Sequence, residues 1–101
     1  MSMTFAAFRD TLSDTAPPDG LSPPLRALWH GGRGDWDAAH EVAQGDDGPE
    51  ACEVHAYLHR QEGDAVNAAY WYRRAGRPVA TGPLDVEWQA LVERMLSRNS
   101  P

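Results

Sequence analysis

The stretches Gly34-Asp35-Trp36-Asp37-Ala38-Ala39 and Gly63-Asp64-Ala65-Val66-Asn67-Ala68 decide the fold of this 101-residue chain. Each begins with a glycine, which can take the left-handed conformation that ends a helix. The aspartate that follows can cap the next helix, and the alanine four residues later lets two helix backbones approach closely. We therefore predict that each stretch is the corner of an antiparallel pair of helices.

The two corners belong to a longer internal repeat. A shift of 29 residues (63 minus 34) aligns residues 27–39 with residues 56–68 and matches Ala27 with Ala56, His30 with His59, Gly34 with Gly63, Asp35 with Asp64, and Ala39 with Ala68. Each copy has the order helix, glycine, capping aspartate, helix. We expect the two helical hairpins to occupy residues 25–44 and 50–75.

Helical periodicity and turn residues extend this prediction to the whole chain. A first helix is expected at 4–14, ahead of the turn Pro17-Pro18-Asp19-Gly20, and the second begins after Ser22 and stops at Gly31-Gly32. A last helix at 84–98 carries an apolar stripe that should cap the others, with Asn99-Ser100-Pro101 frayed beyond it. The prediction is one all-α domain, residues 1–101, of about six helices in antiparallel hairpins.

Residues 25–78 resemble the tetratricopeptide and Sel1-like repeat superfamily. Gly34-Asp35-Trp36-Asp37-Ala38-Ala39 is similar to the corner of such a repeat, and Ala69-Tyr70-Trp71-Tyr72-Arg73-Arg74-Ala75 is similar to a second helix of the Sel1-like type. The 29-residue spacing is shorter than the ~34 of a tetratricopeptide, and two copies are visible where three are usual. The resemblance implies a concave surface for protein partners and no particular ligand. Ala56-Tyr57-Leu58-His59-Arg60 also resembles a group of uncharacterised bacterial proteins.

The charge balance argues against several classes of partner. Nine basic residues against fifteen acidic ones give a net charge of −6, which repels nucleic acid and anionic membrane surfaces. No stretch approaches the ~20 apolar residues of a membrane helix, and the apolar run at the start is too short for a signal peptide. Cys52 is the only cysteine, which suits a reducing compartment. We therefore expect a cytoplasmic protein with no nucleic-acid partner, no membrane and no cofactor.

The histidines are the candidates for a ligand or metal site. His55 and His59 are four residues apart on one predicted helix, so both imidazoles can lie on one face, and His40 or Glu41 of the preceding helix can supply a third ligand. The alternative makes His55 an imidazole at the edge of the core, bonded to a carbonyl or carboxylate. In that alternative His59 is a half-exposed residue at the helix end.

Signals for catalysis are weak. The metalloprotease motif requires glutamate directly after the first histidine, but Ala56 follows His55. No Gly-x-Ser-x-Gly turn is present, and Cys52, although one helical turn from His55, is expected to be a small buried apolar residue. The sequence therefore favours a protein without enzymatic activity.

Three consecutive aromatic residues point to a partner surface. Tyr70, Trp71 and Tyr72 must face three directions on a helix, so at least one is expected to be exposed. An exposed aromatic residue beside arginine is typical of a binding hot spot, which makes Tyr70, Trp71 and Arg74 candidate partner-binding residues. The alternative is that these rings cover the last helix. We expect a protein-interaction module or a self-associating chain, with a small-ligand or metal-binding domain at His40, His55 and His59 as the second hypothesis.

Overall fold

The computed structural model describes residues 3–99, and over that range the chain is all-helical, with no strand. The described elements are six α-helices and one 3-10 turn: α1 (Phe5–Asp10), η1 (Thr11–Ser13), α2 (Pro23–Gly32), α3 (Trp36–Gln44), α4 (Pro49–Glu62), α5 (Ala65–Ala75) and α6 (Leu84–Asn99). This confirms the predicted fold class and number of helices. Asn99, which was predicted to fray, is the last residue of α6, and the predicted fraying of Ser100 and Pro101 lies outside the described residues.

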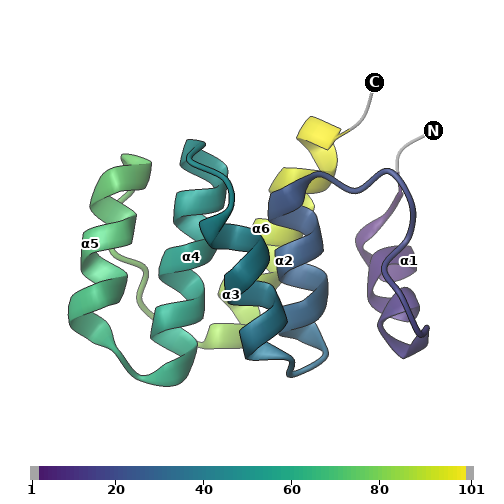
Figure 1. Ribbon diagram of the computed structural model, residues 1–101, viewed down its shortest axis with the longest axis horizontal. Coiled ribbons are helices and arrows are strands. Elements are labelled where there is room, and N and C mark those ends of the chain that lie inside the picture. Colours follow the sequence, from purple (N-terminus) through teal and green to yellow (C-terminus); the bar gives the residue numbers. More distant parts are fainter. Residues whose placement is uncertain (1–2, 100–101) are drawn as a thin grey trace.

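The helices form a row of hairpins with one helix laid across it (Figure 1). The pair α2 and α3 and the pair α4 and α5 each pack together, and α3 also packs against α4. The last helix, α6, contacts α1, α2 and α4, so it covers the row as predicted. Helices α3 and α5 therefore both rest on α4, and α5 forms one end of the row (Figure 1).

The corners have the predicted conformation. Gly34 and Gly63 have φ angles of 80° and 89°, in the left-handed region that glycine adopts without steric cost. Asp35 accepts a hydrogen bond from the backbone N–H of Ala38 at 3.2 Å. Asp64 accepts the equivalent bond from Asn67 at 3.1 Å. These bonds satisfy N–H groups that the first turn of a helix leaves without a helical partner.

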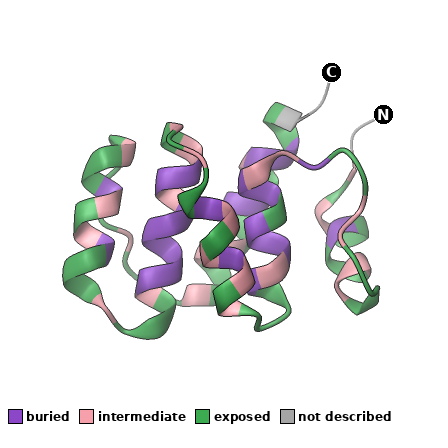
Figure 2. Cartoon of the chain, in the orientation of Figure 1, coloured by how far each residue is buried: buried purple, intermediate pink, exposed green. Residues whose placement is uncertain are grey.

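Helix α4 lies at the centre of the core. Its buried residues occur on all sides of the helix, which Figure 2 shows as an almost continuous run of one colour: Ala51, Cys52, Val54, His55, Ala56, Tyr57, Leu58 and His59. A 14-residue helix surrounded in this way fixes its side chains closely, because its neighbours α2, α3, α5 and α6 leave few rotamers open. Side chains placed on α4 are therefore well suited to form a defined site.

Of the first two helix ends, one was predicted correctly and the other was not. Helix α2 ends at Gly32, so it stops at the glycine pair as predicted. Gly32 also allows close packing, because a Cβ atom there would lie 2.7 Å from Cζ2 of Trp88 in α6. The first helix, in contrast, is shorter than the predicted 4–14, since the α-helix ends at Asp10 and tightens into the turn η1.

Polar contacts attach α6 to the hairpins. The indole N–H of Trp88 donates to the Leu28 carbonyl at 2.9 Å. Glu87 accepts hydrogen bonds from the Tyr72 hydroxyl and from Arg60, whose Nη1 lies 2.6 Å from Oε1. Within residues 3–99, no helix has the length and apolar character required to span a bilayer.

Candidate functional site

Two neighbouring helices bring three histidines together. His40 lies on α3, and His55 and His59 lie one turn apart on α4. The potential ligand nitrogens of these three residues all lie within 4.8 Å of one another. The predicted set His40, His55 and His59 is therefore assembled at one place. Glu41, the other candidate third ligand, is exposed and does not belong to the group.

The three imidazoles are packed ring against ring. Nε2 of His55 lies 2.9 Å from Nε2 of His40, so one nitrogen donates and the other accepts. Their rings meet edge to face at 4.6 Å, and the rings of His55 and His59 stack at 4.9 Å. His40 contacts His59 at 5.3 Å between ring centroids. We call His40, His55 and His59 the histidine cluster from here on. Each of its three rings contacts the other two.

Burial and mutual repulsion lower the pKa values of two members of this cluster, His40 and His55. His55 and His59 are 4% and 6% exposed, and His40 is half-buried. Desolvation, helped by the nearby His40 and His59, lowers the pKa of His55 to about 4. Desolvation and then the charge of His59 also lower the pKa of His40. Neutral imidazole, the form in which histidine binds metals, therefore predominates at His40 and His55 near pH 7.

Two tryptophans and a carboxylate hold the rings in place. Trp36 stacks on His40 with 4.7 Å between ring centroids, and its indole N–H donates to the Leu58 carbonyl at 2.7 Å. Trp71 stacks on His55 at 3.9 Å. Glu62 lies 2.7 Å from Nδ1 of His59 and forms a hydrogen bond with that nitrogen. The second ring nitrogen of His59 is Nε2. Each imidazole consequently has a fixed orientation.

The alternative interpretation of His55 and His59 was wrong on two points. His55 pairs with another histidine, not with a carbonyl or carboxylate. His59 lies in the last turn of α4 as expected, but it is buried and not half-exposed, because Trp36 of α3 packs against its ring. The sequence could not indicate this, since it depends on how closely α3 lies on α4.

The candidate partner surface lies on the neighbouring helix. Tyr70 is 44% exposed, Trp71 is half-buried and Tyr72 is buried, as the three-direction argument predicts. Tyr70 and Trp71 meet edge to face at 5.2 Å. The guanidinium carbon of exposed Arg74 lies 5.0 Å from the Trp71 centroid and 5.9 Å from that of Tyr70. Of the three aromatic residues, Tyr72 contacts the last helix, because its hydroxyl donates a hydrogen bond to Glu87 of α6.

The two candidate sites are continuous. Trp71 contacts Tyr70 and Arg74 on α5 and also stacks on His55 of α4. A single indole therefore connects the histidine cluster with the exposed aromatic surface. The sequence alone leaves the two sites separate, because it does not place α5 relative to the histidine-bearing face of α4.

Cys52 is placed as a structural residue. It is 3% exposed, and its sulfur lies 3.8 Å from the carbonyl oxygen of Asp47. Burial raises the pKa of the thiol, so the nucleophilic thiolate is disfavoured. This agrees with the expectation of a small buried apolar residue.

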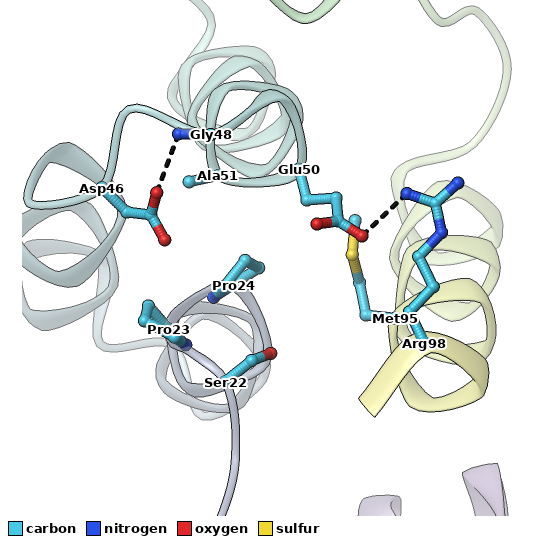
Figure 3. Close-up of a pocket in the computed structure, with 9 residues that line it drawn as sticks. All are labelled: Ser22, Pro23, Pro24, Asp46, Gly48, Glu50, Ala51, Met95 and Arg98. Atoms are coloured by element: carbon cyan, nitrogen blue, oxygen red, sulfur yellow. Dashed lines mark hydrogen bonds and ion pairs between the residues drawn. The ribbon is translucent and has the colours of Figure 1, made fainter. Parts of the chain in front are cut away.

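A separate hollow lies at the N-terminal end of α4. It is bordered by the start of α2, the loop before α4, the start of α4 and the end of α6, with these lining residues: Ser22, Pro23, Pro24, Asp46, Gly48, Glu50, Ala51, Met95 and Arg98 (Figure 3). Its charged groups already have partners, since Arg98 pairs with Glu50 at 2.7 Å and Asp46 accepts from the Gly48 N–H at 2.8 Å. None of the candidate site residues lines this hollow.

Two residues that support the histidine cluster were not predicted. Trp36 stands four residues before His40 and so lies beside it on α3. Glu62 stands three residues after His59, the other spacing that brings side chains together on a helix. Both contacts could have been found by testing helical neighbours of each histidine.

Comparison with known proteins found no match to a family model, to a curated protein or to a solved structure.

Proposed function

We propose that this protein is a non-enzymatic helical interaction module that binds an acidic segment of another protein through one side of α5. The observation that carries the proposal is the arrangement of Tyr70, Trp71 and Arg74, in which a guanidinium lies over two aromatic rings at the surface. Tyrosine, tryptophan and arginine are the residues most enriched in the energetic centres of protein interfaces.

The position of α5 supports this proposal. Its main packing partner is α4, and it stands at the end of the row of helices (Figure 1). The outward side carries Val66, which is 84% exposed, and Tyr70. An apolar side chain with this exposure next to an exposed ring favours an interface, because covering it removes apolar area from water. The resemblance of residues 25–78 to tetratricopeptide and Sel1-like repeats favours the same function.

Charge indicates the chemistry of the partner. Arg73 and Arg74 are both exposed in the last turn of α5, while the whole chain carries a net charge of −6. A locally cationic surface attracts acidic segments and repels basic ones. The acidic remainder of the molecule has the opposite preference, so the two kinds of partner are directed to different surfaces. The same net charge argues against nucleic acid, and the lone buried cysteine suits a cytoplasmic location.

Preorganisation makes the aromatic surface effective. Trp71 is held by His55 behind it and by Tyr70 at its edge, so little side-chain freedom remains to be lost on binding. Arg74 is in turn positioned over both rings. A partner carboxylate can pair with this guanidinium while an apolar side chain of the partner covers Tyr70.

The test is peptide selection followed by direct titration. The full-length protein is screened against a library of 15-residue peptides, and selected peptides are titrated by fluorescence anisotropy. We expect enrichment of Asp and Glu, and at least a ~10-fold weaker affinity for the double variant Tyr70→Ala with Arg74→Ala. Arg26→Ala, an exposed arginine on α2, is the matched control and should bind normally.

Two results would overturn this function. Selected peptides without acidic character, or equal binding by the double variant and the wild type, would remove the α5 surface as the binding site. Sedimentation velocity addresses self-association, the other form of the interaction hypothesis. A dimer that the double variant dissociates would assign the surface to a second copy of this chain and not to a foreign segment.

A further inference from the structure

We propose that His40, His55 and His59 form a binding site for one divalent transition-metal ion of the zinc class. This goes beyond the proposed partner binding and stands on different residues. The distances between imidazole nitrogens, and not the presence of histidine alone, carry the inference.

The spacing of the nitrogens is close to that of a metal site. In tetrahedral zinc sites the metal–nitrogen distance is about 2.0–2.1 Å, which separates two ligand nitrogens by about 3.3 Å. Here the His40–His55 nitrogens are 2.9 Å apart, and all three potential ligand atoms lie within 4.8 Å. To bind one ion, the side chains would rotate about their torsions until the three nitrogens face a common point. A bound ion would replace the hydrogen bond between His40 and His55.

The surroundings of the rings are those of an oriented ligand set. Metal-binding histidines commonly donate their second N–H to a carboxylate, which fixes the ring and raises its basicity. Glu62 provides this contact at Nδ1 of His59, at 2.7 Å. Trp36 and Trp71 stack on His40 and His55, so the imidazoles stay in place without the ion. A site that is ordered before binding loses little conformational entropy when the ion arrives.

The type of ligand selects the class of ion. Neutral imidazole suits zinc, copper, nickel and iron, whereas calcium and magnesium require oxygen ligands. Three protein nitrogens leave a fourth tetrahedral position, and His40 is the partly exposed member of the cluster. We therefore expect water as the fourth ligand.

A second grouping of potential ligands does not fit as well. His59, Glu62 and Asp64 also have ligand atoms within 4.8 Å of one another. Asp64, however, is used as the N-cap of α5, where it accepts the Asn67 backbone N–H at 3.1 Å and its side-chain amide at 3.0 Å. Binding a metal there would remove the cap from the corner that orients α5. The all-histidine set has no such conflict.

The experiment is a metal titration of the full-length, tag-free protein in the absence of any peptide. Zinc binding is followed by calorimetry and cobalt binding by visible absorption. We expect one ion per chain and the absorption bands of tetrahedral cobalt. His40→Ala and His59→Ala should each weaken binding at least ~10-fold, as loss of metal-site residues commonly does. His30→Ala changes the one histidine outside the cluster and should bind as the wild type does.

The controls separate loss of the site from loss of the fold. Circular dichroism checks that each variant is helical, and His40→Gln, which keeps a polar side chain at this half-buried position, replaces His40→Ala if that variant is unfolded. No heat and no cobalt spectrum with the wild type would overturn the proposal, as would wild-type affinity in the folded variants or an equal loss in His30→Ala. Because peptides are absent, failure here leaves the proposed partner binding standing.

Discussion

Substitution of Gly32 by alanine tests the packing of α6 on α2. A Cβ atom at Gly32 would lie 2.7 Å from Cζ2 and 3.2 Å from Cε2 of Trp88, and 3.2 Å from Cδ1 of Leu12. Trp88 cannot easily move away, because its indole N–H donates to the Leu28 carbonyl and its rings contact Phe5 at 5.6 Å. Overpacking of this kind typically costs about 1–3 kcal/mol.

The neighbouring glycine supplies the matched control. At Gly31 a Cβ atom would meet Cδ2 of Leu58 at 3.5 Å, an ordinary van der Waals contact. Both substitutions place alanine in the same helix and gain up to about 1 kcal/mol of helix propensity, so this gain largely cancels between them. We therefore expect Gly31→Ala to be neutral or stabilising and Gly32→Ala to be less stable than Gly31→Ala by about 1–3 kcal/mol.

Urea unfolding followed by circular dichroism measures this difference directly. For a domain of this length, each kcal/mol corresponds to a change of roughly 4–8 °C in Tm, so thermal unfolding gives a second reading. Equal stability of the two variants would show that Trp88 does not lie against Gly32. It would contradict the packing of α6 across the hairpins.

Three further predictions concern the cap, the histidines and the contact to α6. Asp35→Ala should lower the free energy of unfolding, measured in urea, by about 1 kcal/mol, because it removes the hydrogen bond to the Ala38 N–H. Asp37→Ala removes the same charge but no cap, so it should lower this free energy by less. The reverse order would contradict the cap. Burial holds the pKa of His55 at about 4 against an ordinary 6.5, so the unfolded chain binds more protons in this window. The free energy of unfolding should therefore be constant above pH 6.5 and fall by at most about 3 kcal/mol between pH 6.5 and pH 4. An unfolding free energy that does not change over this range would refute burial of neutral His55. Tyr72→Phe removes the hydroxyl that donates to Glu87 and should lower the free energy of unfolding by about 1–2 kcal/mol, which thermal unfolding would show as a lower Tm. An unchanged Tm would contradict that contact.

The helices and their corners could be predicted because their causes are local. Glycine followed by aspartate specifies the end of one helix and the cap of the next within a few residues, and the structure confirms both corners. The packing role of Gly32 could not be predicted, because its cause is not local. Gly32 lies against Trp88, which is far away in the sequence, and no local pattern shows that a glycine admits a neighbouring ring.

The site was predictable only in its members. The spacing of His55 and His59 places both on one face, and the succession of hairpins makes His40 their neighbour. The burial of His59 and the stacking of Trp71 on His55 depend on how α3 and α5 settle on the two sides of α4. Such packing depends on the volumes of all the side chains between the helices, so residue spacing along one helix does not determine it.

The most direct test of this account is a measurement of nuclear Overhauser effects between the side-chain rings in solution. Convergence of α3 and α5 on α4 predicts strong cross-peaks between His55 and Trp71, whose ring centroids are 3.9 Å apart, and between His55 and His40, at 4.6 Å. If His55 instead shows cross-peaks only to residues of α4, the histidine cluster and the surface beside it do not exist as described.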